Sequence, residues 1–296
     1  MGVEELFHLS SNQSIYEHEV AIGKALDTIP LAELYEQAES ALSSGKEGGF
    51  EDHLVMALLK WFKQWFKWVN SPECDRCGGE TNPRGAEPPR PEEAKYGARA
   101  VEIYHCEKCR TLTRFPRYND PVRLLETRCG RCGEWANAFT LLLKALDLDV
   151  RYVWNAEDHV WNEVYSPFHE RWIHVDSCEE AYDRPLIYAD GWGKKMSYVI
   201  GFSVTGARDV TRRYVRRPDA SLPRNRFNEA ELEQVLQGIT IDLRQRMTAE
   251  MREIYSERDE VEEAEMMSYQ EEQVVEVPRQ SGAPDWVAQR GEDGRS

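Results

Sequence analysis

Two closely spaced cysteines, Cys129 and Cys132, mark a stretch of the sequence that could do nucleophilic chemistry. Cys132 precedes an apolar run, and we expect it at the N-terminus of a buried helix over 132–146. Unpaired backbone N–H groups and the helix dipole there favour a thiolate, and they can also donate to a developing oxyanion. The spacing alone leaves open a second interpretation, in which the two cysteines form a metal-binding or redox pair.

A histidine and an aspartate downstream favour the nucleophile interpretation. Two strand-like runs follow the helix, and we expect them to form a hairpin centred between Pro167 and Phe168. That register places His159 directly opposite Asp176, where the carboxylate can orient the imidazole. The prediction depends on the register, because a slip by one residue would move the two side chains to opposite faces.

Competing residues in this region are weaker candidates. His174 also lies on a predicted strand and fits a buried structural histidine, His169 falls in the turn, and Cys178 does not precede a helix. The predicted triad is therefore a nucleophile, a base and an orienting carboxylate that follow one another in the chain: Cys132, His159 and Asp176.

Four further cysteines form two pairs, Cys74-x-x-Cys77 and Cys106-x-x-Cys109. Each pair directs two thiolates at one point, and two pairs complete a tetrahedron without an open position, which is typical of structural zinc. Redox-active or unligated thiols are the alternative. A disulfide framework is disfavoured because the total of seven cysteines is odd and the long chain shows no secretory signal.

The charge balance bears on the partners of the protein. The 296 residues include 37 basic and 53 acidic ones, which gives a net charge of −16. A nucleic acid or an anionic membrane surface would normally face a basic protein, so we expect neither as a partner. There is no run of about 18 apolar residues and no signal peptide, so we expect no membrane insertion and no secreted location.

Helices must flank these candidate residues. We expect an N-terminal helical segment over 1–50, a catalytic core over 51–225 with a zinc module at 71–112, a C-terminal helix over 226–265, and a disordered tail over 266–296. Inside the core we expect an amphipathic helix over 51–69, a loop over 82–93, and strands over 150–154, 159–165 and 171–176.

The residues around the predicted triad resemble the cytosolic peptide:N-glycanase family of the transglutaminase-like superfamily, in its compact fungal form. The matching stretches are RCGEWAN at 131–137, VRYVWN at 150–155, DHVWNEVY at 158–165, RWIHVDSCE at 171–179 and GWGKKMSY at 191–198. With the paired cysteines they cover about residues 50–215. The resemblance implies an α+β fold, with a transglutaminase-like (papain-like) core around an antiparallel sheet, a zinc-binding four-cysteine module and flanking helices.

The resemblance also implies an activity, that of a peptide-N4-(N-acetyl-β-glucosaminyl)asparagine amidase. Such an enzyme hydrolyses the glycan–asparagine amide of misfolded N-glycoproteins in ER-associated degradation. Cys132 is then the nucleophile, His159 the base and Asp176 its orienting partner, and the four paired cysteines hold one zinc ion. The residues that match substrate-binding positions of the family are Trp68, Arg151, Trp161 and Glu163.

The partners implied are unfolded N-glycoproteins and, through a ubiquitin-receptor shuttle protein, the proteasome. The location implied is the cytoplasm or the nucleus. Two alternatives stay open. A transglutaminase or cysteine protease would use the same triad, and a catalytically idle scaffold would keep the zinc module and the terminal helices for binding proteasome-linked partners.

Overall fold

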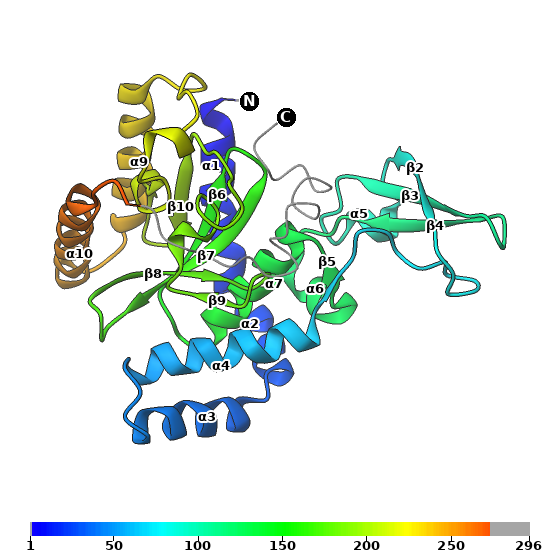
Figure 1. The fold of residues 1–296 in the computed structure, drawn as a ribbon, viewed down its shortest axis with the longest axis horizontal. Helices are drawn as coiled ribbons and strands as arrows, with labels where there is room; N and C mark the ends of the chain where they lie inside the picture. Colours follow the sequence, from blue (N-terminus) through cyan, green and yellow to red (C-terminus); the bar gives the residue numbers. More distant parts are fainter. Residues whose placement is uncertain (1, 273–296) are drawn as a thin grey trace.

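The computed structural model describes residues 2–272 and centres on a six-stranded antiparallel sheet (Figure 1). The strand order is β11-β10-β6-β7-β8-β9. The bounds are β6 Val150–Asn155, β7 His159–Ser166, β8 Arg171–Asp176, β9 Ala181–Tyr182, β10 Val199–Ser203 and β11 Gly206–Asp209. The three strands expected from alternation are thus present as β6, β7 and β8. Strand β7 pairs with β6 on one side and with β8 on the other.

Helix α7 (Cys132–Ala145) packs against β6 and β7 and forms the centre of the main core. Every residue from Glu134 to Leu143 is buried, as its nearly continuous apolar character predicts. The other helices that precede α7 are α1 Val3–Ser11, which packs on β10 and on α9 (Glu229–Arg244), and α2 Glu19–Thr28, α3 Leu31–Ser43, α4 Phe50–Trp65 and α6 Pro121–Thr127, with a 3₁₀ helix at Asn12–Glu17. Helix α3 covers α4 from outside, as Figure 1 shows.

Helix α4 ends at Trp65, earlier than the predicted end at 69, because the chain then enters a short strand. Strand β1 (Lys67–Trp68) runs parallel to β5 (Cys129–Gly130), so Trp68 lies opposite Gly130. This pairing joins the chain that leads into the four-cysteine module to the chain that leads into α7.

The four-cysteine module projects from the core as a three-stranded antiparallel sheet (Figure 1). Its elements are β2 Asn82–Glu87, β3 Val101–Cys106, β4 Thr111–Pro116 and the short helix α5 Pro91–Ala94. The predicted loop over 82–93 is wrong. Its proline, glycine and charged residues form a fully exposed edge strand and a helical turn, and such a strand shows no apolar alternation.

The C-terminal region also differs from the prediction of one helix over 226–265. It contains α9 (Glu229–Arg244) and α10 (Ala249–Ser268), separated at Thr248, whose side chain accepts a hydrogen bond from the N–H of Met251 at 3.2 Å. Helix α10 therefore enters the stretch predicted to be a disordered tail, and residues 273–296 of that stretch lie outside the described residues. The shorter elements are α8 Thr211–Tyr214 and 3₁₀ turns at Pro185–Ile187 and Pro218–Ala220.

The register of the β7–β8 hairpin is also shifted from the predicted one. Ser166 pairs with Arg171, so the loop contains residues 167–170 and its centre lies one residue later than expected. Glu170 takes a left-handed conformation with φ 53°, and the N–H of His169 donates to the Ser166 hydroxyl. This shift moves the position opposite Asp176 by two residues, which keeps the same face of the sheet.

Among residues 2–272, no helix has both the length and the apolar character needed to cross a membrane.

Candidate active site

The start of helix α7 is fixed by hydrogen bonds around Cys132. The Arg131 N–H donates to the Glu134 carboxylate at 2.9 Å, which caps the helix immediately before Cys132. Gly130 is required for this approach, since a Cβ there would lie 2.3 Å from the Cβ of Glu134. At Gly133, by contrast, an added Cβ would meet no atom within 4 Å. Cys132 therefore occupies the predicted helix N-terminus, beside an open first turn.

Two arginines connect this helix start to the four-cysteine module. The Arg131 guanidinium binds both oxygens of Glu102, at 2.9 and 2.7 Å, and Arg117 binds both oxygens of Glu134, at 2.6 and 2.9 Å. Burial favours the neutral acid at Glu102, but Arg131 and Tyr104 lower its pKa to about 2. The segment that carries Cys132 is thus held by charge pairs to the module.

His159 and Asp176 meet in the interior, although they are diagonal and not opposite in the ladder. His159 Nε2 lies 3.0 Å from Asp176 Oδ2, and each side chain is 1% exposed. The other oxygen of Asp176 accepts from the N–H groups of Cys178 at 2.8 Å and Glu179 at 3.2 Å. Burial alone would raise the pKa of Asp176, but the hydrogen bond and charge of His159 hold it below its usual range.

A cavity of about 600 Å³ adjoins the first turn of α7. Gly133 and Glu134 border it from the helix, and Tyr152 borders it from β6. Helix α1 closes another side with Glu4 and His8, and Asn12 follows at the start of the 3₁₀ helix, so N-terminal elements contribute to the space beside α7. Sequence reasoning missed this contribution, because α1 carries no motif that points to a site.

Trp68 lies close to this helix start. Its strand pairs with β5, two residues before Cys132, and its indole N–H donates to the Asn70 side chain at 2.9 Å. The other three residues predicted to bind substrate are more deeply buried, with Arg151 5%, Trp161 1% and Glu163 0% exposed. None of those three lines the cavity at α7.

Arg151 and Glu163 belong instead to a buried ion-pair network with helix α10. Arg151 binds both oxygens of Glu262, at 2.6 and 2.8 Å, and one oxygen of Glu163 at 3.2 Å. Glu163 also accepts from Arg213 and from the Tyr214 hydroxyl, each at 2.7 Å. Strands β6 and β7 are thereby tied to the C-terminal helix on the side of the sheet that Trp161 occupies.

The four paired cysteines converge as their spacing predicts. All four sulfur atoms lie within 4.8 Å of one another, and Cys74 and Cys106 are buried. The Thr111 hydroxyl and backbone N–H groups lower the pKa of Cys74 to about 6. Within residues 2–272 no other group of three or more His, Cys, Asp or Glu side chains clusters in this way, so Cys129 and Cys132 are not part of a second metal cluster there. Four converging thiolates suit a tetrahedral metal ion.

Residues 84–177 match the transglutaminase-like superfamily, and residues 155–267 match the Rad4 transglutaminase-like domain. A peptide-N(4)-(N-acetyl-beta-glucosaminyl)asparagine amidase of Yarrowia lipolytica is 50% identical over 278 residues, which cover 91% of this chain and 78% of the relative. The amidase of that name from Saccharomyces cerevisiae is 45% identical, with coverages of 95% and 83%. The chain belongs to this amidase family. The mouse amidase is 43% identical over 95% of this chain, which corresponds to 44% of the mouse protein.

The solved structure of a Rad4/XPC nucleotide excision repair complex has the same fold, with a TM-score of 0.53 over 89% of this chain and 59% of that chain. At 14% identity the likeness concerns the fold alone. It agrees with the predicted α+β, transglutaminase-like architecture. The first superfamily match contains Cys132, His159 and Asp176, so all three predicted catalytic positions lie in the shared core.

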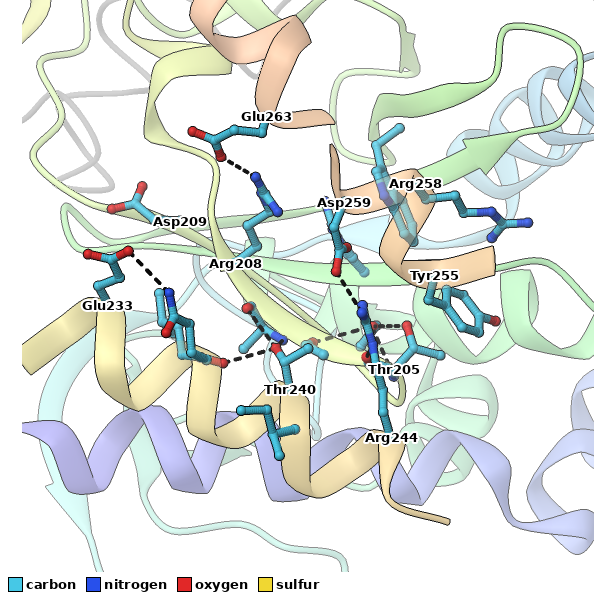
Figure 2. Close-up of a pocket in the computed structure, with 18 residues that line it drawn as sticks. Thr205, Arg208, Asp209, Glu233, Thr240, Arg244, Tyr255, Arg258, Asp259 and Glu263 are labelled. Atoms are coloured by element: carbon cyan, nitrogen blue, oxygen red, sulfur yellow. Dashed lines mark hydrogen bonds and ion pairs between the residues drawn. The ribbon is translucent and has the colours of Figure 1, made fainter. Parts of the chain in front are cut away.

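A second cavity, of about 360 Å³, lies between β11, α9 and α10 (Figure 2). Its charged groups bind one another or nearby residues. Arg244 binds Asp259 at 2.6 Å and Arg208 binds Glu263, as the dashed lines in Figure 2 show. Arg151, one of the residues predicted to bind substrate, lines this cavity, whereas no residue of the predicted triad lines either cavity.

Proposed function

We propose that this family member hydrolyses the amide bond between an N-linked glycan and asparagine, with Cys132 as nucleophile, His159 as base and Asp176 as its orienting carboxylate. The observation that carries the proposal is the buried hydrogen bond of 3.0 Å between His159 and Asp176. It is supported by the position of Cys132 at the first residue of α7 in a chain of this amidase family.

The reaction proposed has two steps. The Cys132 thiolate attacks the carbonyl carbon of the glycosylated amide, and backbone N–H groups at the start of α7 stabilise the oxyanion. The protonated His159 gives its proton to the departing nitrogen, which leaves as the glycosylamine, while a thioester forms on Cys132. His159 then takes a proton from water, and the resulting hydroxide cleaves the thioester to leave aspartate in the peptide and a free thiolate.

The side of the imidazole that serves Cys132 follows from the geometry. Asp176 binds Nε2 of His159, so Nδ1 is the ring nitrogen that we assign to the nucleophile and the leaving group. The assignment reverses the nitrogen roles of the chymotrypsin triad, in which the carboxylate binds Nδ1.

The metal in the four-cysteine module is proposed to be one structural zinc ion, held by Cys74, Cys77, Cys106 and Cys109. A closed set of four thiolates offers no position for a substrate or a reactive water, so the ion would stabilise the module only. Its effect on the reaction would be indirect. Glu102 of the module sheet binds Arg131, the residue directly before Cys132, so a stable module would help to hold the proposed nucleophile in place.

The substrates proposed are unfolded N-glycoproteins, because a folded chain would hide the amide from Cys132. The cavity of about 600 Å³ begins at Gly133, the residue after Cys132, and we propose that it holds the polypeptide next to the reacting amide, although none of the three triad residues lines it. Trp68 lies close to the same turn. Arg151, Trp161 and Glu163 are proposed to support substrate binding indirectly, because they are buried and hold β6 and β7 in place.

The family resemblance further supports a role in ER-associated degradation in the cytoplasm or nucleus. It also supports binding of a ubiquitin-receptor shuttle protein that links the enzyme to the proteasome. Co-purification of the full chain with such a receptor tests this part. Loss of binding on deletion of α1 or α10 would support a contact through a terminal helix, and unchanged binding would exclude these helices from the interface.

The activity itself is tested by the products formed from a denatured N-glycopeptide. Amide hydrolysis predicts an aspartate at the former glycosylation site and release of the whole glycan. A sugar left on asparagine would indicate a glycosidase, a shortened peptide a protease, and a new peptide–amine linkage a transglutaminase. Mass spectrometry separates these outcomes, and unchanged glycopeptide would favour an idle scaffold.

A further inference from the structure

The Asp176 carboxylate has a side-chain partner other than His159. The Tyr188 hydroxyl lies 2.7 Å from Asp176 Oδ2, the same oxygen that faces His159, and 2.7 Å from Nε2 of His174. His174 is 1% exposed and Tyr188 0%. These two residues therefore extend the His159–Asp176 pair into a longer hydrogen-bonded chain inside the protein.

The direction of each hydrogen bond in this chain follows from the groups involved. A carboxylate only accepts, so the Tyr188 hydroxyl donates to Asp176. The Tyr188 oxygen must then accept from Nε2 of His174. Nδ1 of His174 accepts from the backbone N–H of Arg184 at 3.3 Å, so it carries no proton. His174 is thus neutral, and in accord with this its burial lowers its pKa to about 4.

We propose that Tyr188 and His174 are positioning residues for the amidase reaction. The Tyr188 hydroxyl, oriented by neutral His174, fixes the carboxylate of Asp176. Because the hydroxyl shares the charge on Oδ2, it also limits how strongly Asp176 stabilises the imidazolium form of His159. This inference rests on the proposed function, since it gives the two residues a role only if His159 and Asp176 take part in the reaction.

The surroundings make these bonds strong and isolate them from water. The Tyr188 ring centroid lies 4.3 Å from that of Trp161, 5.0 Å from that of Trp192 and 5.2 Å from that of His159. In such a low-dielectric environment, hydrogen bonds to a charged group are worth more than at the surface. The other titratable groups that act on His174 or Tyr188 are Glu163, Asp183, Tyr214 and Glu179.

The test is Tyr188→Phe in the full chain, which removes the hydroxyl and keeps the ring. We expect kcat on a denatured glycopeptide to fall about 10- to 100-fold, the effect of losing a hydrogen bond to a charged group. KM should change less than about twofold, because the Tyr188 side chain is fully buried. The alkaline limb of the pH–rate profile should move to higher pH, since a carboxylate without this donor stabilises the imidazolium more.

Tyr182→Phe is the matched control, because it removes a tyrosine hydrogen bond to another carboxylate, Asp52, outside the triad. This control should keep the wild-type pH profile. A second pair of variants changes His174. His174→Gln keeps an N–H donor for Tyr188 and should stay close to wild type, whereas His174→Leu should behave like Tyr188→Phe. The His174 pair decides the question if Tyr188→Phe does not fold.

An unmoved pH profile with kcat within about twofold of wild type in Tyr188→Phe would overturn this inference. Equal rates for His174→Gln and His174→Leu would do the same. Cys132→Ala, assayed in parallel, separates this result from a failure of the proposed function. If Cys132→Ala is inactive and Tyr188→Phe behaves like the wild type, the positioning role of Tyr188 is contradicted and the proposed triad is not. If Cys132→Ala is active, the proposed triad itself is contradicted.

Discussion

Asp176 shows how a carboxylate can stay ionised where water does not reach. It is 1% exposed, and burial alone would favour its protonated form. Four donors offset that cost, namely His159, the Tyr188 hydroxyl and two backbone N–H groups. Such a carboxylate can fix the tautomer and orientation of its histidine throughout the reaction.

Replacing this carboxylate by an amide therefore has a defined effect. Asp176→Asn should lower kcat by about three to four orders of magnitude, because the amide favours the wrong tautomer of His159. Asp149→Asn is the control, since Asp149 is 35% exposed and pairs with Arg258 outside the triad, and it should retain most of the activity. Steady-state rates on a denatured glycopeptide measure both. An Asp176→Asn variant with more than about a tenth of the wild-type kcat would contradict the assigned role.

At the scale of elements, the helices and strands that could be predicted are those whose burial leaves a pattern within a short stretch of sequence. The apolar run after Cys132 predicted α7, and alternation predicted β6, β7 and β8, because burial on a helix or sheet face leaves a pattern in the residue order. The hairpin register was wrong, since it depends on a four-residue turn with Glu170 in a left-handed conformation. Its error of two positions preserved the face, so His159 and Asp176 still meet.

The features that sequence reasoning missed depend on contacts between distant segments. Strand β2 is exposed along its whole length and is stabilised by pairing with β3, so it has no apolar signature. The break between α9 and α10 falls at Thr248, inside the stretch that was predicted as one helix over 226–265. Tyr188 approaches Asp176 only in the folded chain, and its segment shows no motif with a chemical meaning.

Helix α10 is attached to the sheet by a buried charge, Glu262, which binds Arg151 and Arg213 and is 2% exposed. Glu262→Gln would leave these arginines without their carboxylate, so the free energy of unfolding at pH 7 should fall by about 3–5 kcal/mol. Urea unfolding measures this. Glu263→Gln is the control, because its pair with Arg208 is half exposed and should contribute less than about 1 kcal/mol.

The same carboxylate predicts a pH dependence. Arg151 and Arg213 lower the pKa of Glu262 from 4.5 to about 2, against the effect of burial. Its contribution to stability is therefore present above pH 4.5 and is lost as the pH falls from 4.5 towards about 2. The stability difference between wild type and Glu262→Gln should shrink over that window. A difference that stays constant with pH would show that Glu262 does not act through its charge.

At the scale of the whole molecule, the four-cysteine module and the core are joined through Glu102 and Arg131, directly before Cys132. Cys106→Ser should therefore lose the metal, destabilise the module and lower activity together, whereas Cys129→Ser should keep the metal. Elemental analysis should find about one zinc per wild-type chain. A folded, fully active protein that contains no metal would contradict the structural zinc site.

The fold alone does not determine the activity of this molecule. The Rad4/XPC complex has the same fold at 14% identity, whereas the amidases of two yeasts share 45–50% identity with this chain. The chemistry proposed for this chain therefore depends on the residues around α7 and not on the fold alone.

The most direct test of this account compares Cys132→Ala with Cys129→Ala on one denatured N-glycopeptide, with mass spectrometry as the readout. Cys132→Ala should form no aspartate product and release no glycan, because no thioester can form. Cys129→Ala should convert asparagine to aspartate at close to the wild-type rate, because Cys129 precedes the helix and takes no part in the proposed reaction. Aspartate formed by Cys132→Ala at the wild-type rate would contradict the central claim.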